Sequence, residues 1–272
     1  MPWVESFSAS FRARHEERDT DDAARVLDRL ERRRTELDGL FPGGAPGELT
    51  VILHAHPVAL VLAEPLLLAR WASTSPAGRR YLVGWAGLRE IHALAPRASQ
   101  GRASAVPGSR ELLNSVPEAL YARCVMARSN PCIPPPHSPR RLLRYLRRSW
   151  VVDGAAAWFG GQVPHARPAI ARRLREGPRP AFPPSLADAG LLGATVIDLL
   201  VREEGVGSAV ALVCAPAKTS SDVMLTQAFG GRAPERTEAA WRAHLERLTS
   251  GTVQREATRP EPASDDWLGE VD

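Results

Sequence analysis

The chain has 272 residues, of which 44% are hydrophobic, and this is enough to fill the core of one large domain or two small ones. Its longest apolar run, residues 58–69, contains Glu64 and Pro65 and is shorter than the roughly 20 residues that a membrane span requires, so we expect no membrane partner. The net charge is +4, and the excess of arginine over lysine reflects a GC-rich genome as readily as an anionic partner, so we do not expect a nucleic-acid partner on this ground. The first residues lack the cationic and apolar blocks of a secretory signal. We therefore expect a cytoplasmic protein.

Residues 6–107 show a mixture of strand and helix patterns. Alternating apolar and polar side chains predict a strand from Ser6 to His15, and leucines at helical spacing predict a helix from Asp21 to about Phe41. Later patterns predict a buried strand at 49–53, a helix from Pro57, two adjacent strands or a hairpin at 81–85 and 90–95, and an exposed loop at 96–107.

Residues 108–250 are predicted to be mainly helical. Apolar residues at helical spacing indicate a helix over 111–130, and this segment contains no histidine. After a proline-rich connection, helices are predicted at 139–159, 166–176, 188–204, 208–214, 220–228 and 237–248. The acidic tail, 251–272, has little to bury and is predicted to be disordered. The pattern as a whole predicts an α+β fold in a single domain over residues 1–250, with a small mixed sheet first and a helical half after it.

One segment of the helical half matches a known motif. Residues 150–159, Trp-Val-Val-Asp-Gly-Ala-Ala-Ala-Trp-Phe, resemble the W-L-x-E-G-x-A-x-[YW]-F element of gluzincin metallopeptidases, the thermolysin and aminopeptidase type. A Gly-terminated segment at 191–205, Ala-Phe-Gly at 228–230 and Thr-Glu-Ala-Ala-Trp-Arg at 237–242 are similar to the segments that follow in that family. The resemblance covers roughly residues 6–248 and implies a zincin-like fold.

In that family a zinc ion is held by His-Glu-x-x-His on one helix and by a glutamate on the next. The zinc makes a bound water nucleophilic, and the glutamate of the motif takes its proton. In this chain the helix over 111–130, which corresponds by order, has no histidine, and Asp153 stands at the position of the third ligand. The resemblance therefore implies a degenerate peptidase-like protein with no zinc site, no cofactor and no catalytic residue.

The remnant of the zinc site is predicted to include Asp153, Arg128, Trp150 and Gly154. A buried carboxylate without its metal is costly unless a cation or a donor compensates it. We therefore expect an arginine beside Asp153, with Arg128 as the first candidate. The former catalytic cleft, between the two halves, is expected to bind a peptide or a protein without cleaving it.

A second interpretation keeps the protein an active hydrolase with non-standard metal ligands. His54 and His56 follow a predicted strand, where alternate side chains point the same way. They or His92 would have to meet Asp153 to complete a metal site, because no third ligand lies near them in the sequence.

A third interpretation assigns an anionic partner to arginine-rich helices. The densest cluster consists of Arg140, Arg141, Arg144, Arg147 and Arg148, of which 140, 144 and 147 or 148 share one helix face and are the candidates for binding an anion. A second cluster consists of Arg172, Arg173, Arg175 and Arg179. Aromatic residues are sparse around both clusters, which favours a solvated helix surface over nucleic-acid binding.

Overall fold

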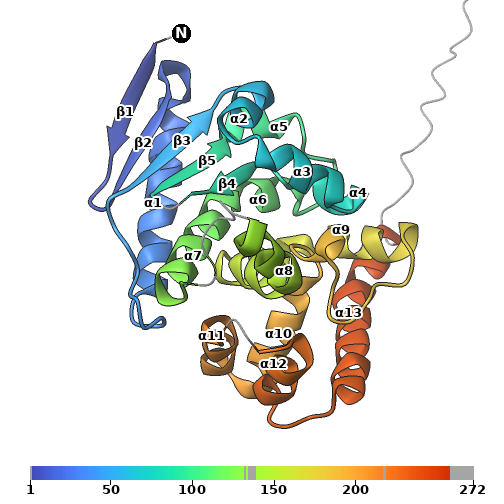
Figure 1. Ribbon diagram of the computed structural model, residues 1–272. Helices are drawn as coiled ribbons and strands as arrows, with labels where there is room; N and C mark the ends of the chain where they lie inside the picture. The colour runs from blue at the N-terminus through green and yellow to red at the C-terminus, as the bar shows by residue number, and fades with distance from the viewer. Residues whose placement is uncertain (1, 88, 132, 134–138, 217–218, 258–272) are drawn as a thin grey trace, which may run out of the picture.

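The computed structural model describes the chain except for residues 1, 88, 132, 134–138, 217–218 and 258–272, and the side chains of 139–141 and 251–257 also lie outside the described part. The fold is α+β, as predicted: a five-stranded mixed sheet in the N-terminal half is followed by a mainly helical half. Figure 1 shows the sheet at one end of the molecule and helices α10 to α13 at the other, with α7 and α8 between them.

The sheet has the strand order β1-β2-β3-β5-β4. Its strands are β1 (Trp3–Phe7), β2 (Phe11–Glu16), β3 (Leu49–His54), β4 (Gly84–Ala86) and β5 (Glu90–Leu94). The three central strands β2, β3 and β5 are parallel, and the edge strands β1 and β4 pair antiparallel to their neighbours. The predicted buried strand at 49–53 and the adjacent pair within 81–95 are confirmed.

The prediction of a single strand from Ser6 to His15 is wrong, because the chain reverses at residues 8–10 to form a hairpin. Glu31 stabilises the turn by accepting hydrogen bonds from the Ser8 hydroxyl at 2.7 Å and the Ser10 amide at 2.6 Å. The apolar alternation continues through the turn in the sequence, so periodicity alone gives no sign of it. On either side of the turn the environments differ, since Phe7 is exposed and Phe11 is buried.

The described residues of the first part of the chain form the α-helices α1 (Thr20–Leu37), α2 (Pro57–Ala63), α3 (Leu66–Ser73), α4 (Pro76–Arg79) and α5 (Pro96–Gln100). The stretch 96–107, predicted to be an exposed loop, therefore begins with a short helix. The predicted helix over 111–130 is two helices, α6 (Ser109–Asn114) and α7 (Val116–Ser129). Pro117 explains the break, because proline suits the first turn of a new helix and not the interior of a continuous one.

The remaining helices are α8 (Pro139–Phe159), α9 (Val163–Glu176), α10 (Gly193–Glu204), α11 (Val206–Cys214), α12 (Ser221–Ala228) and α13 (Pro234–Ala257). Each corresponds to a predicted helix. However, α13 continues past residue 251, where the disordered tail was predicted to begin, and the rest of that tail lies outside the described residues. Extending an existing helix costs far less than starting one, which accounts for the extra turns.

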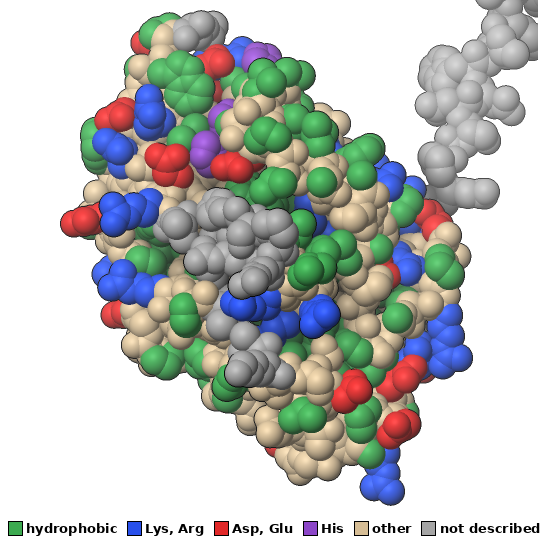
Figure 2. All heavy atoms as spheres, viewed as in Figure 1, with side chains coloured by type: hydrophobic (Ala, Val, Ile, Leu, Met, Phe, Trp, Pro, Cys, Tyr) green, Lys and Arg blue, Asp and Glu red, His purple; other side chains and the backbone are tan. Residues whose placement is uncertain are grey.

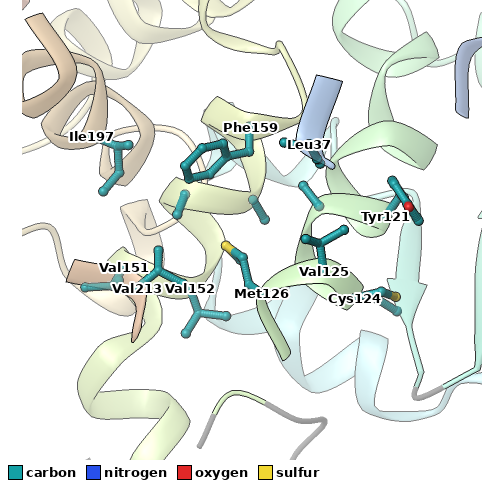
Figure 3. Close-up of a cluster of buried hydrophobic side chains, with 14 of the residues drawn as sticks. Leu37, Tyr121, Cys124, Val125, Met126, Val151, Val152, Phe159, Ile197 and Val213 are labelled. Atoms are coloured by element: carbon teal, nitrogen blue, oxygen red, sulfur yellow. The ribbon is translucent and has the colours of Figure 1, made fainter. Parts of the chain in front are cut away.

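The hydrophobic core lies where the two halves meet. Helices α1 and α7 contact each other and the sheet, and α8 packs between α7 and α10. Figure 3 shows side chains of α1, α7, α8, α10 and α11 in one cluster, among them Leu37, Tyr121, Cys124, Val125, Met126, Val151, Val152, Phe159, Ile197 and Val213. Burial of each of the larger apolar side chains contributes roughly 1.5–3 kcal/mol, so this cluster fixes α7 and α8 relative to each other.

None of the helices in the described part of the chain combines the length and the apolar character that crossing a bilayer requires.

Candidate functional site

Asp153 is the centre of a buried polar cluster. Its Oδ1 accepts a hydrogen bond from Nη1 of Arg123 at 3.1 Å, and its Oδ2 accepts hydrogen bonds from Nη2 of Arg70 at 2.8 Å and from the Tyr145 hydroxyl at 2.7 Å. The side chains of Arg70, Arg123 and Asp153 are 9%, 10% and 11% exposed. Both carboxylate oxygens are therefore bonded to charged or neutral donors of the protein itself.

Three helices bring this cluster together. Tyr145 and Asp153 lie about two turns apart on α8, Arg123 comes from α7 and Arg70 from α3. Arg70 is also held from behind, because its Nη1 donates to the Leu186 carbonyl at 2.9 Å and to the Thr74 hydroxyl at 3.0 Å. The position of Asp153 is thus set by contacts from two other helices.

A glycine in the edge strand lets α7 lie close to the sheet. A Cβ atom on Gly84 would lie only 2.6 Å from Cδ1 of Leu120, which is one helical turn before Arg123. The Arg123 guanidinium carbon lies 5.5 Å from the ring centroid of Trp85 and 5.1 Å from that of Tyr145. These distances allow cation–π attraction, which helps to hold a buried arginine.

Tyr145 keeps its proton in this cluster, mainly because it is buried. Burial, together with the neighbouring Asp153 carboxylate, raises the pKa of Tyr145 well above its usual range. Burial by itself would lower the pKa of Arg70, but the negative charge of the Asp153 carboxylate and the hydrogen bond to it raise it above its ordinary value. With both guanidinium groups charged and one carboxylate between them, the cluster carries one excess positive charge.

A cavity of about 150 Å³ lies beside the cluster. Arg70, Arg123, Tyr145 and Asp153 form one part of its wall. The rest is mainly apolar and includes Val83, Leu112, Val116, Leu120, Ala157 and Ala166. The arrangement is a small apolar chamber with charged groups on one side.

Helix α7 does not place a ligand pair where the resemblance leads us to expect one. By the order of segments in that family, the metal-binding motif would fall near residues 124–131. This stretch begins with Cys124, Val125 and Met126, which are buried in the core (Figure 3). The pairing of Asp153 with an arginine is found, but the prediction of Arg128 is wrong. The Nε of Arg128 donates to the Gly43 carbonyl at 2.7 Å, so this side chain points to the opposite side of α7 from Arg123.

Trp150 and Gly154, the other predicted remnants of the site, have packing roles. Trp150 is buried, and a Cβ atom on Gly154 would lie 2.4 Å from the backbone carbon of Gly193 in α10. A Cβ atom on Gly193 would in turn lie 2.5 Å from the Trp150 carbonyl oxygen. The two glycines allow α8 and α10 to cross in near contact, and this crossing positions Asp153, the residue next to Gly154.

The histidines of the second interpretation do not join Asp153. Nε2 of His54 lies 3.1 Å from Nδ1 of His92, and Nε2 of His92 lies 3.7 Å from Glu64 and 3.5 Å from Glu90. Burial, and then the nearby His92, lower the pKa of His54 to about 4. His56 is exposed and lies 3.4 Å from Arg18. The partners that would complete a metal site around Asp153 are therefore not brought to it.

The arginine clusters of the third interpretation do not form one exposed basic face. Arg148 is buried, and its Nη1 donates to the Ala215 carbonyl at 3.1 Å. Arg147 is exposed and Arg144 is half-buried, while the side chain of Arg140 lies outside the described residues. In the second cluster Arg173 is buried in an ion pair with Asp188, at 2.6 Å. The helical spacing predicts that Arg148 lies on the same face as the other arginines of its cluster, but its side chain faces α12 and the core.

The zinc ion that the resemblance implies does not fit at Asp153. A zinc ligand must turn a free lone pair towards the metal, and here two guanidinium groups and a hydroxyl take three of the roughly four lone-pair sites of the carboxylate. The same guanidinium groups would repel a divalent cation. Within the described residues, no three His, Cys, Asp or Glu side chains come together as metal ligands.

No protein-family model, curated protein or solved structure matches this chain. The likeness to gluzincins therefore depends on the residues quoted above.

Proposed function

We propose that this protein is a non-catalytic relative of the gluzincin metallopeptidases that binds a ligand in the cleft where those enzymes hold zinc. The order of its segments supports this proposal, with a small sheet first and then the helix α7, the motif-bearing helix α8 and the helix α10. The close crossing of α8 and α10 at Gly154 gives a structural reason for one of the motif residues.

The observation that carries the proposal is the set of bonds to Asp153. Where the family has a carboxylate that binds a metal, this chain has a carboxylate bound by Arg70, Arg123 and Tyr145. The ion pairs join α3, α7 and α8, as a metal would join its ligand-bearing helices. A carboxylate held in this way does not offer zinc the ligand that water activation in that family requires, which supports binding as the function that we propose for the cleft.

The proposal is tested by metal analysis of the purified protein together with its melting temperature. We expect less than stoichiometric zinc after incubation with excess zinc and dialysis, and an unchanged melting temperature after treatment with a chelator. We also expect no cleavage of a peptide library.

Stoichiometric zinc that a chelator removes, with a lower melting temperature afterwards, would overturn the proposal in favour of the hydrolase interpretation. The variant Asp153→Asn then shows whether that zinc is bound at Asp153 or elsewhere in the protein. If the zinc is lost in this variant, Asp153 is a ligand, and if it is retained, the metal lies elsewhere.

A further inference from the structure

Short side chains make room for the chamber beside the polar cluster. Ala119 of α7, Ala157 of α8, Ala166 of α9 and Ala194 of α10 all belong to its wall, and all four are buried. Protein interiors are otherwise packed as densely as organic crystals, so a space of about 150 Å³ is unusual. The four helices meet around this space without filling it, and they leave room for a ligand.

The charged groups of the wall are bonded to one another. Asp153 accepts hydrogen bonds from Arg70, Arg123 and Tyr145. Nε and Nη2 of Arg123 have no partner among the described residues, but they are shielded from the chamber as well as from bulk water, so they offer an occupant no bond. The surface that the wall presents is mainly apolar, and a charged occupant would lose its hydration there without an equivalent set of bonds. The wall therefore favours a neutral, apolar occupant.

The size of the chamber limits the size of that occupant. An apolar cavity of about 150 Å³ in another protein binds benzene or xenon. Here the aliphatic side chains of Leu112, Val116 and Leu120 and the aromatic rings of Tyr81 and Trp85 are available to contact a ring. The chamber is partly open to solvent, so a small molecule can enter it.

We propose that this chamber binds a small, neutral, apolar molecule about the size of one benzene ring. The molecule is held by contact with the aliphatic and aromatic side chains of the wall and not by the two arginines. This inference rests on the proposed function, because it names the ligand class of the same cleft.

Isothermal titration calorimetry with matched probes tests the proposal. Phenol has nearly the shape of toluene but carries a hydroxyl, and we expect it to bind about tenfold or more weakly, because burial of an unpaired hydroxyl costs at least that factor. Benzoate and benzylammonium carry a charge of either sign, and neither should bind measurably at millimolar concentration. N-acetylphenylalaninamide places the same ring on a peptide unit and should bind less tightly than toluene.

Two variants connect the binding to the chamber. Ala157→Leu fills part of the space, so it should weaken toluene binding at least about tenfold without lowering the melting temperature. Ala239→Leu makes the same change at an exposed position of α13 outside the wall, and it should leave the affinity unchanged.

A crystal pressurised with xenon locates the site without any substitution, which matters if Ala157→Leu does not fold. We expect a xenon atom inside the chamber, in contact with its aliphatic side chains. Xenon bound only at other places, or full toluene affinity in a folded Ala157→Leu variant, would overturn the assignment of the site.

The probes separate the remaining outcomes. Phenol, benzoate or benzylammonium binding as tightly as toluene would contradict the neutral, apolar character of the occupant. Tighter binding of N-acetylphenylalaninamide would indicate a peptide and would overturn the assignment of a free small molecule. If toluene does not bind at millimolar concentration to protein that is folded and free of zinc, the inference fails while the proposed function stands. Stoichiometric zinc at Asp153 would overturn the proposed function, whatever toluene does.

Discussion

Nη1 of Arg123 lies 3.1 Å from Oδ1 of Asp153, and this contact joins α7 to α8. Arg123 lies one residue before the stretch of α7 in which the metal-binding motif is expected. A cation on a side chain thus takes the place that the resemblance assigns to a metal cation.

Removal of the Asp153 charge should destabilise the protein strongly. Asp153→Asn leaves two buried guanidinium groups without their counter-charge, and we expect a loss of about 3–5 kcal/mol in the free energy of unfolding. Urea denaturation of the variant and of the unmodified protein measures this difference in the free energy of unfolding. Glu176→Gln, which removes one partner of the exposed pair with Arg172, is the control and should change the stability by less than about 1 kcal/mol. A loss at Asp153 as small as that in the control would contradict the structural role of the cluster.

The crossing of α8 and α10 should tolerate no side chain at Gly154. Gly154→Ala places a Cβ atom against the backbone of Gly193, and we expect a destabilisation of about 1–3 kcal/mol because the two helices must separate. Gly207→Ala is the matched control, since Gly207 lies in α11 with no atom near its missing Cβ. There, alanine should be neutral or stabilising by up to about 1 kcal/mol. Similar effects of the two substitutions would argue against a close crossing.

The buried His54 should make stability depend on pH. Its pKa is about 4 in the folded protein and 6.5 when unperturbed, so between these values the unfolded state binds more protons than the folded state. Stability is therefore full above about pH 6.5, falls as the pH drops towards 4 and changes no further from this group below that. The total loss is at most about 3 kcal/mol.

Denaturation at pH 7 and pH 5 measures this effect. We expect His54→Gln to reduce the difference in stability between the two pH values. His56→Gln, at the exposed histidine two residues later, should leave the difference as in the unmodified protein. An equal response of both variants would show that another group causes the pH dependence.

Cys124 should resist alkylation in the folded protein. Burial raises the pKa of its thiol to about 12, so little reactive thiolate is present at pH 8. Cys214 is half-buried, and its pKa is also raised by burial. We expect iodoacetamide to modify Cys214 before Cys124, as read by mass spectrometry of the peptides. Rapid labelling of Cys124 would contradict the burial of this side chain in the core.

Much of the fold follows from local patterns in the sequence. The boundaries of α8, the strand β3 and the helical second half depend on apolar periodicity and on glycine or proline stops, which are local properties. The turn at Ser8 to Ser10 interrupts no apolar alternation, and it is closed both by local bonds between Ser8 and Phe11 and by Glu31, a residue distant in sequence. The break between α6 and α7 has a local signal, Pro117. The apolar spacing on either side of this proline indicates one continuous helix, and the prediction followed that spacing.

The candidate site was predictable only in part. The need of Asp153 for a cationic partner follows from the cost of burying a charge, and an arginine is found beside it. The identity of that arginine depends on which side of α7 faces α8, and Arg128 lies on the opposite side of that helix from Arg123. Arg70 reaches the site from a helix far away in the sequence, so no local pattern indicates it. Tyr145 had a weak signal, since it lies two helical turns before Asp153.

A crystal structure of the protein grown with excess zinc, with anomalous diffraction collected at the zinc edge, tests the central claim most directly. We expect no zinc peak at Asp153, and nitrogen atoms of Arg70 and Arg123 within hydrogen-bonding distance of its carboxylate. A zinc peak bonded to Asp153, with either arginine displaced from the carboxylate, would contradict the claim.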